Sequence, residues 1–137
     1  MRRLHLLLVA FFVCLLAASA AFAGRIVEVG QLSNGKTIVL HPTDRLVVTL
    51  AGNASTGYFW RVKTLDRRFV KFVSRIYVPS DGDPKVGAAG KYVLRFRAVA
   101  VGATPLKLAY VQSGGSGAKP AKTFRLSLVV KAPPPRI

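Results

Sequence analysis

The chain has few of the residues that most enzymes use for catalysis. Its 137 residues include one cysteine, two histidines and five acidic residues. Cys14 and His5 lie in an N-terminal segment that we expect to be removed, so His41 is the one histidine left. A cysteine nucleophile is then excluded, and a Ser-His-Asp triad would need His41 to meet a serine and a buried acid. Asp44 lies three residues further on, but a capped turn is the simpler interpretation of 41–44.

Metal and nucleotide sites are equally hard to build from this composition. One histidine and five scattered acidic residues do not make a transition-metal site. Asp81 and Asp83 would attract Ca²⁺ weakly, and Pro84 follows where a further oxygen ligand would be needed. The glycines at 87 and 90 lack the spacing and the lysine of a phosphate-binding loop. We therefore expect no enzymatic activity, no metal and no cofactor.

The first 23 residues have the three parts of an export signal. Two arginines follow Met1, an apolar stretch covers 6–17, and Ala21-Phe22-Ala23 forms a cleavage motif. The apolar stretch is short for a helix that spans a bilayer, and no small residue precedes Cys14 as a lipoprotein signal would require. We predict a cleaved signal peptide over 1–23, a mature chain that begins at Gly24, and a periplasmic or secreted location.

The expected mature chain has no cysteine and a large excess of positive charge. Without disulfides, a single hydrophobic core must hold the fold, and a chain of this length is sufficient for one. Removal of Arg2 and Arg3 leaves 19 basic and five acidic residues, a net charge of +14. Such an excess favours acidic partners and weak association with anionic surfaces. No run of five or more basic residues occurs, however, and the basic residues sit singly along the predicted strands, so we expect no nucleic-acid binding.

Apolar and polar residues alternate along most of the mature chain, and no sustained helical pattern is present. In 91–101 the apolar side chains fall on one face and Arg95 and Arg97 on the other. Strands are predicted at 25–29, 36–40, 45–50, 58–62, 70–78, 91–101, 106–110 and 123–131. Asn34-Gly35 is typical of a tight hairpin turn. Seven or eight short strands indicate an all-β antiparallel sandwich over 24–131, followed by a flexible proline-rich tail at 132–137.

The segment from Asn53 to Trp60 is the most distinctive in the chain. Small and turn-forming residues occupy 53–57, and Gly57 can adopt a positive φ without steric cost. Tyr58 and Trp60, two residues apart on the outgoing strand, would point to the same side and anchor the turn from inside. An ordinary hairpin that supplies core aromatics would give the same pattern, so these residues alone do not assign a function.

This segment resembles the Asn-Pro-Thr-Thr-Gly-Tyr-x-Trp loop of chagasin-type inhibitors of papain-like cysteine peptidases. Five positions match, Ser55 replaces a threonine, and Ala54 replaces the proline. The segment 87–90 is similar to the second family loop, Gly-x-Gly-Gly, with Ala89 in place of one glycine. The third family loop carries Arg-Pro-Trp or Arg-Pro-Phe shortly after a tyrosine, and here Tyr110 is followed by Val-Gln-Ser-Gly-Gly at 111–115, so that motif is absent.

The resemblance implies an immunoglobulin-like fold and a monomeric, exported inhibitor of papain-type cysteine peptidases that blocks the active-site cleft with a loop wedge. Thr56 would lie closest to the catalytic cysteine and histidine of the peptidase. The peptidase-binding residues would be Asn53, Ala54, Ser55, Thr56, Gly57 and Tyr58 in the first loop, Gly87, Ala88, Ala89 and Gly90 in the second, and Gln112, Ser113 and Gly114 in the third. Lack of the third-loop aromatic would weaken binding about thirtyfold, and restoring Arg-Pro-Trp across 112–114 would tighten it.

A basic binding module on the same scaffold, without inhibitory activity, is the alternative. Outward cations on the predicted strands would form a basic sheet face that recognises an anionic glycan, a lipid or an acidic protein. The cations are Arg95, Arg97, Lys107, Arg125 and Lys131. Salt separates the two hypotheses, because binding by a basic face falls steeply with ionic strength, whereas binding by an apolar wedge does not.

Overall fold

The computed structural model describes residues 24–80, 89–115, 117 and 119–136. Its eight strands are β1 (Ile26–Val29), β2 (Thr37–Leu40), β3 (Arg45–Gly52), β4 (Tyr58–Thr64), β5 (Val70–Pro79), β6 (Gly90–Ala98), β7 (Gly102–Gln112) and β8 (Lys122–Val130). Two short 3-10 turns, η2 (Gln31–Ser33) and η3 (Ala54–Thr56), complete the regular structure. The all-β prediction is confirmed, and no helix in the described part is long and apolar enough to cross a membrane. The predicted signal peptide lies outside the described residues.

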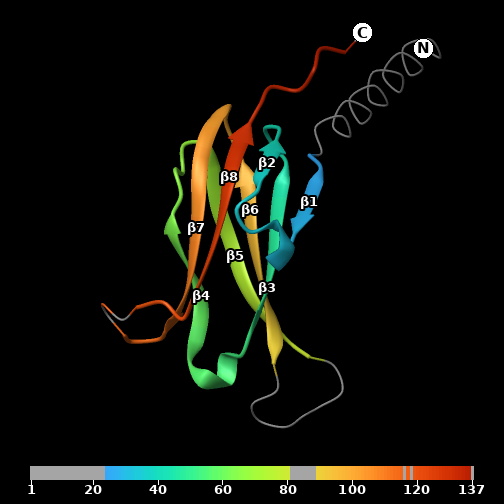
Figure 1. Cartoon of the computed structure of the whole chain (residues 1–137). Helices are drawn as coiled ribbons and strands as arrows, with labels where there is room; N and C mark the ends of the chain where they lie inside the picture. The colour runs from blue at the N-terminus through green and yellow to red at the C-terminus, as the bar shows by residue number, and fades with distance from the viewer. Residues whose placement is uncertain (1–23, 81–88, 116, 118, 137) are drawn as a thin grey trace, which may run out of the picture.

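The strands form two packed sheets, in the orders β1-β3-β6-β5 and β2-β8-β7-β4 (Figure 1). The inward residues of the alternating pattern build a single core between them, as the sequence predicts. Its largest fully buried side chains are Trp60, Phe96 and Phe124. The sandwich is open at its edges, because β1, β5, β2 and β4 are each paired on one side only.

The edge strands β1 and β2 differ from the expected antiparallel arrangement. β1 pairs in parallel with β3, and β2 pairs in parallel with β8, so both sheets are mixed. The predicted hairpin at Asn34-Gly35 is therefore wrong, because the chain crosses there from one sheet to the other. The turn instead docks on β8: the Gly35 amide donates to the Arg125 carbonyl at 2.7 Å, and Asn34 Oδ1 accepts the Arg125 amide at 2.9 Å.

Asp44, in the turn before β3, ties the start of the described chain to the sandwich. Its carboxylate is buried and accepts the amides of Arg25 and His41 at 2.9 and 2.8 Å, and the Arg25 guanidinium at 3.0 Å. Burial raises the pKa of Asp44, but these bonds outweigh it and leave the pKa below its ordinary 3.8. Because Asp44 binds the His41 backbone and not its ring, the turn interpretation is supported over a catalytic pair.

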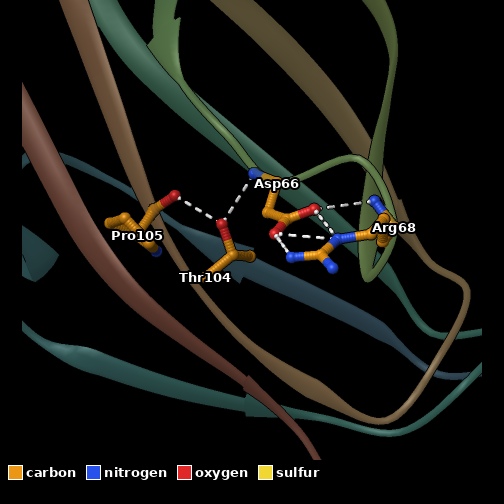
Figure 2. A network of polar contacts seen from close by, with 4 residues as sticks. All are labelled: Asp66, Arg68, Thr104 and Pro105. Atoms are coloured by element: carbon orange, nitrogen blue, oxygen red, sulfur yellow. Dashed lines mark hydrogen bonds and ion pairs between the residues drawn. The ribbon is translucent and has the colours of Figure 1, made fainter.

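A second polar network fixes the connection from β4 to β5 (Figure 2). Thr104 Oγ1, buried at the start of β7, accepts the Asp66 amide at 2.8 Å and donates to the Pro105 carbonyl at 2.9 Å. The Asp66 carboxylate pairs with the Arg68 guanidinium at 2.7 Å. These contacts hold the end of the sandwich at which β8 ends and β3 begins.

The outward basic residues do not share one face, so the predicted single basic face is wrong. Arg95 and Arg97 belong to β6 in one sheet, whereas Lys107 and Arg125 pair across β7 and β8 in the other. Because the two sheets turn their outer surfaces in opposite directions, each surface has to be considered separately. Lys131 follows the end of β8.

Candidate functional site

The described parts of the three predicted loop segments meet at one end of the sandwich, away from the end where β8 finishes (Figure 1). Gly52, which precedes the first loop, pairs with Gly90 of β6. Tyr58, which follows the first loop, pairs with Gln112 of β7. Gly87 and Ala88 of the second segment lie outside the described residues. The strand register therefore places 53–58, Ala89–Gly90 and 112–114 side by side.

The first loop is a compact turn closed by its own hydrogen bonds. Asn53 caps η3: its Oδ1 accepts the Ser55 amide at 3.1 Å and the Ser55 hydroxyl at 2.6 Å. Thr56 Oγ1 donates to the Asn53 carbonyl at 2.6 Å. Gly57 then reverses the chain in a left-handed conformation with φ 77°, which a residue with a Cβ adopts only under strain. Residues 54–57 are exposed, so this turn presents a fixed backbone shape to solvent.

Aromatic side chains hold both arms of this turn from beneath. The hydroxyl of Tyr110 accepts the Asn53 amide at 2.8 Å, and the hydroxyl of Tyr92 donates to the Tyr58 carbonyl at 2.8 Å. The indole of Trp60, which is buried, donates to the Ala51 carbonyl at 3.1 Å. Burial, and next the neighbouring Tyr110, raise the pKa of Tyr92, so its hydroxyl stays protonated to a higher pH than that of an ordinary tyrosine.

These rings also pack on one another. Tyr110 lies 5.3 Å from Tyr58 and 5.2 Å from Trp60 between ring centroids, and Tyr92 packs against Tyr77 at 5.0 Å with the rings tilted by 53°. Sequence reasoning predicted the inward anchoring by Tyr58 and Trp60, but it missed Tyr92 and Tyr110 as supports. Only the register of β6 and β7 against the loop strands reveals them.

The second segment contributes differently from the first. Ala89 is exposed, but Gly90 is buried in the sheet. A Cβ on Gly90 would meet the Tyr77 hydroxyl and the Val78 carbonyl at 2.5 Å, and one on its partner Gly52 would meet the Tyr92 ring at 2.6 Å. Both glycines are thus required for the tyrosines to pack beneath the loop, and Gly90 supports the site from within.

The third segment braces the first. The Ser113 amide donates to the Gly57 carbonyl at 2.8 Å, and Gly114 adopts φ 81°. Gln112, Ser113 and Gly114 are exposed and supply no aromatic ring.

A shallow hollow of about 380 Å³ lies between the segments. Its walls include Asn53, Thr56, Tyr58, Ala89, Tyr110 and Lys122. The lining is largely apolar, with backbone and aromatic surface, and holds no acid, histidine or cysteine. Within the described residues no three His, Cys, Asp or Glu side chains lie close enough together to hold a metal ion. Such a surface is suited to contact with another macromolecule.

Comparison with known proteins supports the resemblance seen in the loop. Residues 39–128, more than half of the chain, match the family model described as Chagasin family peptidase inhibitor I42. No curated protein sequence matches the chain.

Several solved structures share the fold. The cysteine protease inhibitor EhICP2 from Entamoeba histolytica superposes with a TM-score of 0.69 at 21% identity, over 78% of this chain and 96% of that one. Amebosin gives a TM-score of 0.64 at 24% identity, over 78% and 98%. PbICP-C, solved in complex with falcipain-2, gives 0.52 at 19% identity, over 79% and 100%. These matches identify the sandwich as the immunoglobulin-like fold of such inhibitors. With residues 39–128 matching its model, the chain belongs to the chagasin family of peptidase inhibitors.

Proposed function

We propose that the protein is an exported inhibitor of papain-type cysteine peptidases, and that the turn 53–58 is the wedge that enters the active-site cleft. The observation that carries the proposal is the hydrogen bonding of this turn, which is closed by its own bonds and anchored to Tyr110 and Tyr92. Family membership supports the inhibitory function. The complex of PbICP-C with falcipain-2 supports a cysteine peptidase as the partner.

The shape of the turn suits a blocking role. A papain-type active site is a narrow cleft with a reactive thiolate beside an imidazolium. The 3-10 turn and the left-handed Gly57 give the chain a bent path, which does not offer the extended backbone that a peptidase cleaves. Because the turn is ordered before binding, little conformational entropy remains to be lost in the complex.

The end of β7 would flank the wedge without anchoring it. The motif Arg-Pro-Trp placed across 112–114 conflicts with the structure, because proline at 113 removes the amide that binds the Gly57 carbonyl. Tryptophan at 114 would also have to adopt φ 81°. We therefore no longer expect that replacement to tighten inhibition. Ser113→Trp retains the amide and adds an aromatic ring beside the wedge, so it is the better variant for gaining affinity.

The test is a titration of residues 24–137 into papain and a cathepsin-type peptidase, followed with a fluorogenic substrate. Thr56→Arg should abolish inhibition, since it places a long cation into a cleft that already holds an imidazolium. Thr37→Arg, the same change at an exposed position of β2, should leave inhibition intact. Thermal melts should show that both variants fold. The proposal is wrong if the wild-type protein leaves both peptidases fully active at tens of micromolar, which would mean a binding free energy weaker than about −6 to −7 kcal/mol.

A further inference from the structure

The outer face of the β1-β3-β6-β5 sheet carries a row of cations in direct register. Arg45 of β3 lies opposite Arg97 of β6, which in turn lies opposite Lys71 of β5. Arg95 and Lys91 follow on the same face of β6. Adjacent strands are about 4.8 Å apart, and like charges directly opposite one another destabilise a sheet. The stability of the fold therefore does not explain this row.

Few acidic groups are near enough to neutralise these cations. Glu28 on β1 is the one acidic residue of this sheet in the described part of the chain. The described residues form two ion pairs, Arg25–Asp44 and Arg68–Asp66, and neither pair includes a residue of the row. An external anion would supply the missing negative charge.

Exposed aliphatic side chains lie among the cations. Arg45, Arg95 and Arg97 line a hollow of about 360 Å³ together with Ile26, Val47 and Val73. Ile26 and Val73 are each 60% exposed. Ile76, opposite Val93 of β6, is 48% exposed, and Val78, opposite Lys91, is 47% exposed. Single exposed aliphatics are common on protein surfaces, but these four share one face with five basic residues.

We propose that this face binds the surface of membranes that contain anionic phospholipids. Guanidinium groups bind phosphate oxygens in a paired, directional way, so the arginine-lined hollow suits a lipid headgroup. The neighbouring aliphatic side chains would enter the boundary between headgroups and acyl chains. A soluble polyanion would use the cations and leave the aliphatics in water, and a second copy of the same face would be repelled by its charge.

The arginine-lined part of this face lies away from the peptidase-binding end. Arg45 and Gly52 are the two ends of β3, and at about 3.3 Å per residue they lie roughly 23 Å apart. Arg45, Arg97 and Lys71 are therefore at the end of the sheet opposite the wedge, whereas Lys91, next to Gly90, and its partner Val78 lie at the wedge end. Binding to vesicles through the arginines can therefore be measured separately from the proposed inhibition.

The test is co-sedimentation of residues 24–137 with vesicles of phosphatidylcholine, with and without phosphatidylglycerol. We expect binding only to the anionic vesicles. Arg45→Gln with Arg97→Gln should weaken it about thirtyfold, because each basic residue near an anionic bilayer contributes about a factor of five. Lys107→Gln with Arg125→Gln is the matched control, since it removes an equally close cross-strand pair from the opposite sheet. The control should bind as the wild type does.

Two further variants and one competitor separate the possible ligands. Ile76→Thr should weaken binding to anionic vesicles and leave binding to soluble dextran sulfate unchanged. The Arg45/Arg97 variant should inhibit the peptidase as the wild type does. If the Arg45/Arg97 and Lys107/Arg125 variants lose vesicle binding equally, the proposal is overturned in favour of a diffuse attraction by the overall positive charge. Binding to dextran sulfate but not to vesicles would overturn it in favour of a glycan, and binding to neither would exclude an anionic ligand at this face.

Discussion

Replacement of Tyr110 by phenylalanine tests whether the aromatic support controls the wedge. The hydroxyl of Tyr110 accepts the Asn53 amide at 2.8 Å, while its ring packs on Tyr58 and Trp60. Tyr110→Phe removes the hydroxyl and keeps the ring, so core packing is retained. The Asn53 amide, which is partly buried, then loses its acceptor at the point where the chain leaves β3 for the turn.

The expected loss of stability in Tyr110→Phe follows from the cost of leaving a buried donor unpaired, which is about 1–3 kcal/mol. Because Asn53 is only partly buried, we take the lower half of this range and expect a loss of about 1–1.5 kcal/mol in the free energy of unfolding, measured by urea denaturation. Inhibition should weaken about three- to tenfold, since the turn would have to be ordered again on binding.

Tyr92→Phe is the matched comparison. It removes a hydroxyl that donates to the Tyr58 carbonyl at 2.8 Å, on the other arm of the same turn. A carbonyl left with one unused lone pair is tolerated better than an orphaned amide, so Tyr92→Phe should cost less than Tyr110→Phe. If Tyr110→Phe changes neither stability nor inhibition, the idea that this hydroxyl pre-organises the wedge is refuted.

Three further predictions concern the core, the Asp44 turn and export. Trp60→Ala should lower the free energy of unfolding by about 3–5 kcal/mol, because the ring is 1% exposed; a negligible effect in urea denaturation would contradict its role in the core. The pKa of Asp44 is lowered in the fold, since its bonds to His41 and Arg25 outweigh the effect of burial, so its stabilising contribution is complete above the ordinary pKa of 3.8 and is lost as pH falls through the folded value. The difference in melting temperature between wild type and Asp44→Asn should therefore shrink below pH 3.8, and a constant difference would contradict this. Intact-mass measurement of the exported protein should show a chain that begins at Gly24, and a mass that includes residues 1–23 would contradict the signal peptide.

The strands could be predicted because alternation records which face of each strand is buried. β6 and β8 were found within three residues of their ends for this reason. Alternation contains no information on which strands are neighbours. The parallel pairing of β1 with β3 and of β2 with β8 was therefore missed. Asn34-Gly35 failed as a hairpin signal because a left-handed glycine turns the chain in the same way whether the next strand joins the same sheet or the opposite one.

The site was predictable where a turn depends on local residues. Asn53, Thr56 and Gly57 form bonds and dihedral angles within a few positions of one another, so their sequence identifies the turn. The supports are different, because Tyr92 and Tyr110 lie 34 and 57 residues away from the groups that they bind. Their role depends on the register of β6 and β7, which no short motif specifies.

The end of β7 shows why a missing motif need not remove a function. In the family that this chain resembles, the third loop presents an aromatic ring, and here the same place holds Ser113, whose amide binds the Gly57 carbonyl at 2.8 Å. A proline in that position has no amide to donate, so the usual motif and this bond exclude one another. In the proposed inhibitor this segment would contact the first loop in place of the peptidase. An inhibitor built in this way would depend more heavily on the turn 53–58, and the rigidity of that turn would set its affinity.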